Sequence, residues 1–285
     1  MAGSDSPATN CRFSTRISLR WLPEPAHETT DTIVMSVKGW YLDLRMDKYT
    51  GEINWAIAGQ RLIESQEPRL SLSKQAIPIF KVVSNILAVE VSFTHELDSH
   101  NAFESADCGT FVTLPNGDDL ETGSMPRPDL PGTPVTAYEE IWRELPFREG
   151  PEGPKKGISW ILESDDENLG EGEVTVTKTF LGRIWGTFLS LQQDQVHGRK
   201  KGSDGKWTVS KTGADVSARR EEWSSGWKER YVVGKNGATL PSIITGFEGE
   251  GEGPWRVPGE KVKIQGKWYI VRAFEEISSS LPSRL

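Results

Sequence analysis

The chain has 285 residues but only two cysteines and four histidines. Cys11 and Cys108 are too few for a disulfide framework, so we expect a reducing, cytoplasmic setting. Metal centres need clusters of His, Cys or carboxylate ligands. His95 and His100 lie five residues apart, a spacing that places them on opposite faces of a strand. The sequence therefore predicts neither a disulfide nor a metal site.

Long apolar runs and an excess of basic charge are also missing. No run of 18 apolar residues occurs and the N-terminus lacks an apolar signal core, so we expect no membrane span and no secretory signal. The net charge of −8 argues against nucleic acid as a partner, because phosphate contacts need a basic face. The sequence has no Walker A loop, no G-x-S-x-G elbow and no dinucleotide fingerprint. We therefore expect no cofactor.

Helical periodicity is scarce, and apolar residues alternate with polar ones instead. Segments such as RISLRWL, DTIVMSV and AVEVSFTHEL are typical of strands, and we expect about eight strands in each half of the chain. Asn116-Gly117, Asn236-Gly237 and Gln265-Gly266 between them suit the positive φ of tight hairpins. Many short antiparallel strands favour closed barrels, since closure removes exposed strand edges.

The most informative feature is an internal repeat. Residues 137–141 (AYEEI) return as residues 273–277 (AFEEI), 136 positions later. Other words recur in the same order: RISLRW and GISWIL, DTIVMS and GEVTVT, and the two Asn-Gly turns. This predicts one domain of about 130 residues used twice. We expect an all-β fold of two tandem antiparallel barrels, at residues 12–147 and 156–279.

Eleven tryptophans are available as core filler or as walls for a flat ligand. In residues 40–45 (WYLDLR), Trp40 and the two leucines share one face of a strand, and Tyr41, Asp43 and Arg45 share the other. If the first face packs against the partner domain, the second points into a barrel lumen as a cluster of donors and acceptors. The alternative is that this row is simply the solvent face.

The second half holds similar combinations of aromatic rings and guanidinium groups. They suit a planar ligand whose oxygen is bound by an arginine or a tyrosine, although structural Arg–Glu pairing across strands explains them equally well. The candidate substrate-binding residues are Trp40, Trp55, Trp185, Phe188 and Trp223. The candidate catalytic donors are Tyr41, Arg45, Arg183 and Arg219.

Taken together, the words GEINWAIAG, NGDDLETGSM and AYEEIWREL resemble the fungal Hri-type proteins, over about residues 14–277. This resemblance implies two lipocalin-like barrels in tandem. It brings no agreed catalytic residues. The founding yeast member is known as an interactor of a casein-kinase-type protein kinase, which implies a protein partner.

Relatives of this family in fungal natural-product clusters imply a second possibility. Some resemble cofactor-free pericyclases, such as hetero-Diels–Alderases that join a tropolone-type quinone methide to a terpene alkene. Two hypotheses follow: a pericyclase for a hydrophobic conjugated metabolite in secondary-metabolite biosynthesis, or a non-enzymatic interaction protein that binds a protein kinase or forms a homodimer. The sequence alone separates them poorly, and the eleven tryptophans, more than two small barrel cores require, favour the first.

Overall fold

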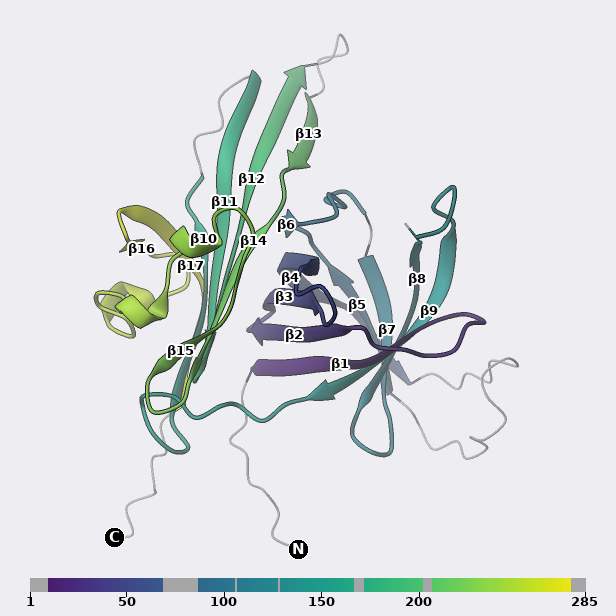
Figure 1. The fold of residues 1–285 in the computed structure, drawn as a ribbon, viewed down its shortest axis with the longest axis horizontal. Helices are drawn as coiled ribbons and strands as arrows, with labels where there is room; N and C mark the ends of the chain where they lie inside the picture. The colour runs from purple at the N-terminus through teal and green to yellow at the C-terminus, as the bar shows by residue number, and fades with distance from the viewer. Residues whose placement is uncertain are drawn as a thin grey trace, which may run out of the picture.

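A computed structural model gives the structure of the protein. It describes residues 10–68, 87–105, 107–127, 129–166, 172–201 and 207–277. The described residues form two antiparallel β-sheets, one from each half of the chain (Figure 1). None of the helices in this part of the chain combines the length and hydrophobicity that crossing a membrane requires.

The first sheet closes on itself to form the N-terminal barrel. Its strands are β1 (Cys11–Trp21), β2 (Thr30–Val37), β3 (Trp40–Asp47), β4 (Ile53–Pro68), β5 (Leu87–Phe93), β6 (Leu97–Asp98), β7 (Asp107–Thr113), β8 (Asp119–Pro126) and β9 (Val135–Glu144). They follow the order β3-β2-β1-β9-β8-β7-β5-β4, and β4 pairs again with β3, while β6 adds to β4. The ring leaves no edge among these eight strands.

The second sheet is built from the second half. Its strands are β10 (Gly157–Ser164), β11 (Gly172–Ile184), β12 (Thr187–Lys201), β13 (Trp207–Gly213), β14 (Ser217–Trp223), β15 (Trp227–Val233), β16 (Lys261–Ile264) and β17 (Lys267–Ile277). The order is β15-β14-β12-β11-β10-β17-β16, with β13 beside β12. Three short 3₁₀ helices lie between β15 and β16: η1 (Gly237–Thr239), η2 (Ile243–Thr245) and η3 (Gly253–Arg256). Contacts of η2 with β15 and of η3 with β16 and β17 bridge the two outer strands.

The predicted all-β fold with tandem barrels is confirmed. The N-terminal barrel is closed by hydrogen bonds, and the second sheet is completed by the segment that carries η1 to η3. The repeated pentapeptide has the same place in both halves: Tyr138 on β9 pairs with β1, and Phe274 on β17 pairs with β10. The predicted end of the second domain at residue 279 lies outside the described residues.

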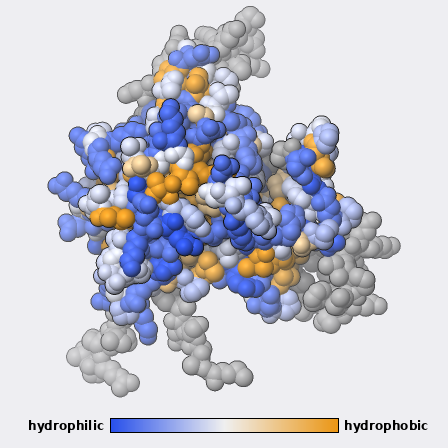
Figure 2. All heavy atoms as spheres, viewed as in Figure 1, coloured by the Kyte–Doolittle hydropathy of each residue, from blue (hydrophilic) through white to orange (hydrophobic). Residues whose placement is uncertain are grey.

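A shared apolar core joins the two sheets. Leu42 and Leu44 on β3 are buried in one cluster with Ile161 and Phe180 of the second sheet. Gly182 on β11 allows this approach, because a Cβ there would lie 3.3 Å from the Leu42 side chain. The odd-numbered residues of β3 consequently face the inside of the N-terminal barrel. Elsewhere the surface is mostly hydrophilic with small scattered apolar groups, as Figure 2 shows for one face.

Candidate functional site

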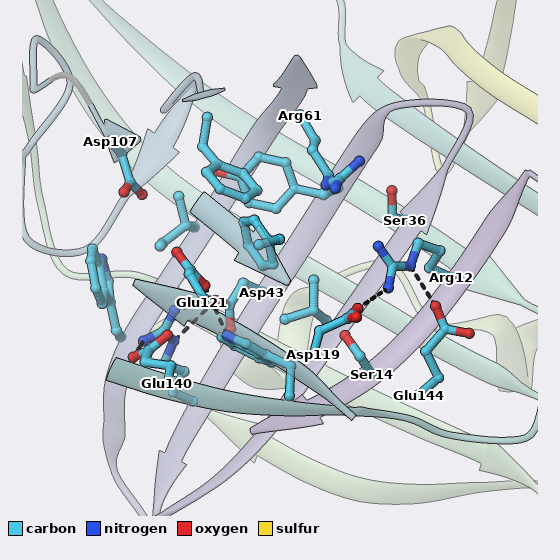
Figure 3. Close-up of a pocket in the computed structure, with 18 of the residues that line it drawn as sticks. Arg12, Ser14, Ser36, Asp43, Arg61, Asp107, Asp119, Glu121, Glu140 and Glu144 are labelled. Atoms are coloured by element: carbon cyan, nitrogen blue, oxygen red, sulfur yellow. Dashed lines mark hydrogen bonds and ion pairs between the residues drawn. The ribbon is translucent and has the colours of Figure 1, made fainter. Parts of the chain in front are cut away.

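The inside of the N-terminal barrel, here called the lumen, contains a cavity of about 90 Å³. Side chains from β1, β2, β3, β4, β5, β7, β8 and β9 line it, so its walls are rigid sheet rather than loop. Figure 3 shows Arg12, Ser36 and Arg61 toward one end of the cavity and Asp107, Glu121 and Glu140 toward the other. Arg12, Ser36 and Arg61 also line an adjoining second pocket, which marks this end as the mouth.

A buried ion network surrounds Arg45 inside the lumen. Arg45 donates from Nε and Nη2 to Asp43 Oδ2, at 3.0 and 2.7 Å, and its Nη1 lies 3.6 Å from Glu140 Oε1. Arg16 Nη1 donates to the same Glu140 oxygen at 2.6 Å. Burial by itself lowers the pKa of Arg45, but Asp43 and Glu140 outweigh it and raise that pKa, so the guanidinium stays charged.

Aromatic rings cover the remaining wall. The Arg45 guanidinium carbon lies 4.7 Å from the centroid of Trp55 and 5.6 Å from that of Trp142. Tyr41 and Phe93 meet edge to face with centroids 5.4 Å apart. Tyr41 donates its hydroxyl to the carbonyl of Thr94 at 3.0 Å, and burial raises its pKa well above 10. Tyr41 is therefore a neutral residue of the cavity wall, and its hydroxyl proton is already donated to Thr94.

Glu121 is an unusual carboxyl group in the lumen. It is 6% exposed, it binds the Tyr138 hydroxyl at 2.9 Å through Oε1, and it accepts from Trp142 Nε1 at 2.8 Å through Oε2. Its cross-strand partner is another acid, Glu140. Burial first, and then the charge of Glu140, raise the pKa of Glu121 to about 8. Glu121 is thus protonated at neutral pH.

This raised pKa makes stability depend on pH. Below pH 4.5 the carboxyl is protonated in both states, whereas between 4.5 and about 8 only the folded protein holds the proton. Stability should therefore fall as pH rises through this range. We expect Glu121→Gln to lack this loss, as measured by urea denaturation at pH 5, 6.5 and 8. Glu52→Gln, an exposed control, should follow the wild-type curve; parallel curves for wild type and Glu121→Gln would contradict the assignment.

His95 and two aspartates form a hydrogen-bonded cluster beside the wall of the lumen. His95 contacts Asp98 Oδ2 at 2.8 Å through Nδ1 and Asp107 Oδ2 at 3.2 Å through Nε2. Burial lowers the pKa of His95, but these two hydrogen bonds outweigh it and raise the pKa to about 9. Asp98 also accepts from Trp55 Nε1 at 2.9 Å, so the cluster positions one wall of the cavity. The described residues contain no group of three or more potential metal ligands.

The structure brings three of the predicted site residues together. Tyr41, Arg45 and Trp55 line the cavity. Trp40 lies on the opposite face of β3, between the sheets, where its ring is 6.4 Å from that of Phe180. The alternative interpretation of residues 41, 43 and 45 as a solvent face does not hold, because all three are buried in the lumen.

The other predicted residues lie in the second sheet, away from this cavity. Arg183 donates to the carbonyl of Trp185 and to Glu152, at 2.8 and 2.6 Å. Arg219 donates to Glu221 at 2.9 Å. Three predicted wall residues pack against other rings: Trp185 against Phe147, Phe188 against Trp160, and Trp223 against Trp227. Structural pairing, the alternative considered for this half, describes these contacts.

Sequence reasoning missed most of the lumen. Glu121 follows the predicted Asn116-Gly117 turn by four residues, and it lies on β8 and faces inward. Gly109 leaves the space that Glu121 occupies, since a Cβ there would lie 2.3 Å from Glu121 Oε1. The period-two pattern of residues 119–125 could have indicated an inward row. The position of Glu121 opposite Glu140 could not be predicted from the sequence, because it depends on the register between the strands.

These features define a tandem β-barrel protein with a polar and aromatic cavity in its first barrel. The sequence model of the family described as Protein HRI1 matches residues 12–267, so the chain belongs to that family. No curated protein matches the chain. The crystal structure of YLR301w, an uncharacterized protein from Saccharomyces cerevisiae, is similar with a TM-score of 0.61 and 15% identity, covering 93% of this chain and 99% of that one. This likeness shows the fold alone.

Proposed function

We propose that the N-terminal barrel binds a small conjugated molecule in its lumen. The observation that carries the proposal is the contrast between the two halves. An eight-stranded barrel is just wide enough for side chains to fill, and protein interiors are normally close-packed. The second half follows this rule, since Trp160, Phe188, Phe247 and Trp255 fill its core. The first half instead keeps a cavity lined by aromatic and charged groups.

The size of the cavity limits the ligand. Pockets for drug-sized ligands are roughly 300–1,000 Å³, whereas an engineered cavity of about 150 Å³ takes benzene. The enclosed volume of about 90 Å³ is smaller than that cavity, so the ligand is limited to a single ring that also occupies the open mouth, or to the terminal ring of a longer molecule. Trp55, Trp142 and Phe93 supply flat faces for such a ring.

A cofactor-free cyclisation catalyst, including a hetero-Diels–Alderase, is a second candidate function. Glu121 favours it, because a carboxyl protonated at neutral pH can hydrogen-bond a ligand oxygen that gains negative charge. One such donor is worth about 3 kcal/mol, and holding two reactants in register can supply about 7–11 kcal/mol. With the volume available, one reactant would occupy the lumen and the other would lie at the mouth. A role as a protein-kinase partner gains no comparable support from the lumen.

Fluorescence titration tests the binding proposal. Addition of single-ring conjugated ligands should quench tryptophan emission saturably at micromolar concentration, because Trp55 and Trp142 line the cavity. Val34 also lines it, so Val34→Phe should fill the lumen and abolish the quenching. Val135→Phe, at a 70% exposed position on β9, is the control and should bind normally. An unchanged response in Val34→Phe, or none in the wild type, would contradict the proposal.

A further inference from the structure

One buried oxygen in the lumen lacks a hydrogen-bond partner. Asp43 is 4% exposed and lines the cavity. Its Oδ2 accepts both hydrogen bonds from Arg45, but Oδ1 has no partner among the described residues. Buried polar atoms are almost always paired, so an unpartnered carboxylate oxygen indicates where a hydrogen-bond donor of a ligand can bind.

The mouth holds a cation without a matching anion. Three arginines line the cavity, and two have carboxylate partners: Arg45 binds Asp43, and Arg12 binds Asp119 at 2.8 Å. Arg61 makes no ion pair with any described residue and instead lies over the ring of Phe111, 5.7 Å from its centroid. Burial and the charge of Arg12 lower the pKa of Arg61, and the carboxyl groups of Asp119 and Glu121, neither of which forms an ion pair with Arg61, offset this only in part. A planar guanidinium in this state suits a carboxylate.

The two polar points lie at opposite ends of an aromatic wall. The backbone amide of Arg61 donates to the carbonyl of Gly39, and Asp43 lies four residues further along the barrel, which is ~13 Å of strand. Tyr41 lies between the two levels, and Phe93 contacts both Tyr41 and Phe111 edge to face. Tyr41, Phe93 and Phe111 therefore supply aromatic faces between the donor site and the cation.

The charges that line the cavity determine the orientation of the bound ligand. The inner end holds the negative charges of Asp43 and Glu140 beside Arg45, with Glu121 neutral at neutral pH, whereas Arg61 and Arg12 lie together at the mouth (Figure 3). A carboxylate at the inner end would meet like charges. A neutral donor there would meet the free oxygen of Asp43.

We propose that the lumen binds a small aromatic acid that carries a hydroxyl group. Its carboxylate binds Arg61, its ring packs against Tyr41, Phe93 and Phe111, and its hydroxyl donates to Asp43 Oδ1. This assignment rests on the proposed ligand binding by the N-terminal barrel and names the class of ligand.

Calorimetry on the full chain with 4-hydroxybenzoate, benzoate and phenol tests this assignment. We expect 4-hydroxybenzoate to bind, and the two analogues that each lack one polar group to bind at least about tenfold more weakly. The Arg61→Gln variant should bind 4-hydroxybenzoate no more tightly than it binds phenol. Asp43→Asn, checked for folding by its melting curve, should no longer prefer 4-hydroxybenzoate to benzoate. Arg148→Gln, an exposed arginine outside the lumen, should keep the wild-type order.

The outcomes separate this assignment from the proposed function. Equal binding of phenol and 4-hydroxybenzoate by the wild type, or an unchanged preference for the acid in Arg61→Gln, overturns the assignment. It leaves the lumen as a binding site for neutral rings. If none of the three probes binds, the assignment is also overturned, and the Val34→Phe titration decides separately whether the lumen binds ligands at all. If Asp43→Asn does not fold, the comparison of benzoate with 4-hydroxybenzoate on the wild type still tests the hydroxyl contact.

Discussion

Arg45→Met is expected to lower the free energy of unfolding by about 3–5 kcal/mol, the cost of leaving a buried charge without its partner. The charge is that of Asp43, whose carboxylate accepts hydrogen bonds from Arg45 alone among the described residues. Both side chains are less than 10% exposed, and methionine offers the buried carboxylate no replacement donor. Chemical denaturation with an unchanged m-value measures the loss.

Two further variants isolate the cause. Asp43→Asn combined with Arg45→Met removes both charges, so it should recover much of the stability that Arg45→Met alone loses. Arg148→Met breaks the ion pair with Glu222, in which the arginine is 44% exposed, and should cost only about 0–1 kcal/mol. If Arg45→Met costs no more than Arg148→Met, the ion network does not hold the barrel together.

Trp160→Ala is expected to lower the free energy of unfolding by about 3–5 kcal/mol through the cavity that it leaves. Trp160 is fully buried in the core of the second half, with ring centroids 5.5 Å from Trp255 and 6.1 Å from Phe188. Its Nε1 also donates to Glu250 at 3.0 Å, which ties the segment between β15 and β16 to the sheet. Loss of this ring should therefore loosen the part of the second half that is not closed by strand pairing.

The matched control is Trp268→Ala, since Trp268 is 50% exposed on β17 of the same sheet. It should change the stability by less than about 0.5 kcal/mol. Trp160→Phe keeps most of the apolar volume but loses the bond to Glu250, so it should fall between the two alanine variants. Equal melting temperatures of Trp160→Ala and Trp268→Ala would contradict the description of this core.

The two strands that carry the repeated pentapeptide, β9 and β17, show how the same strand arrangement can enclose two different interiors. Tyr138 in the first copy and Phe274 in the second occupy the same position of the repeated pentapeptide, and both are buried. The hydroxyl of Tyr138 binds Glu121 in the lumen, whereas Phe274 joins the aromatic core of the second half. The polar groups of an interior need hydrogen-bond or ion-pair partners at fixed positions, whereas an apolar interior needs only side chains that fill it. The hollow copy is therefore the one that carries the proposed function.

The sequence by itself determined the all-β class, the repeat of residues 137–141 as 273–277, and the shared face of Tyr41, Asp43 and Arg45. These follow from local periodicity and from order along the chain, which need no knowledge of distant contacts. Only the tertiary structure decided which half is hollow, that Glu121 lies opposite Glu140, and that Arg61 forms no ion pair with any described residue. Periodicity shows which face a residue occupies, but register between strands and packing between sheets choose its neighbours, and neighbours determine charge, burial and cavities.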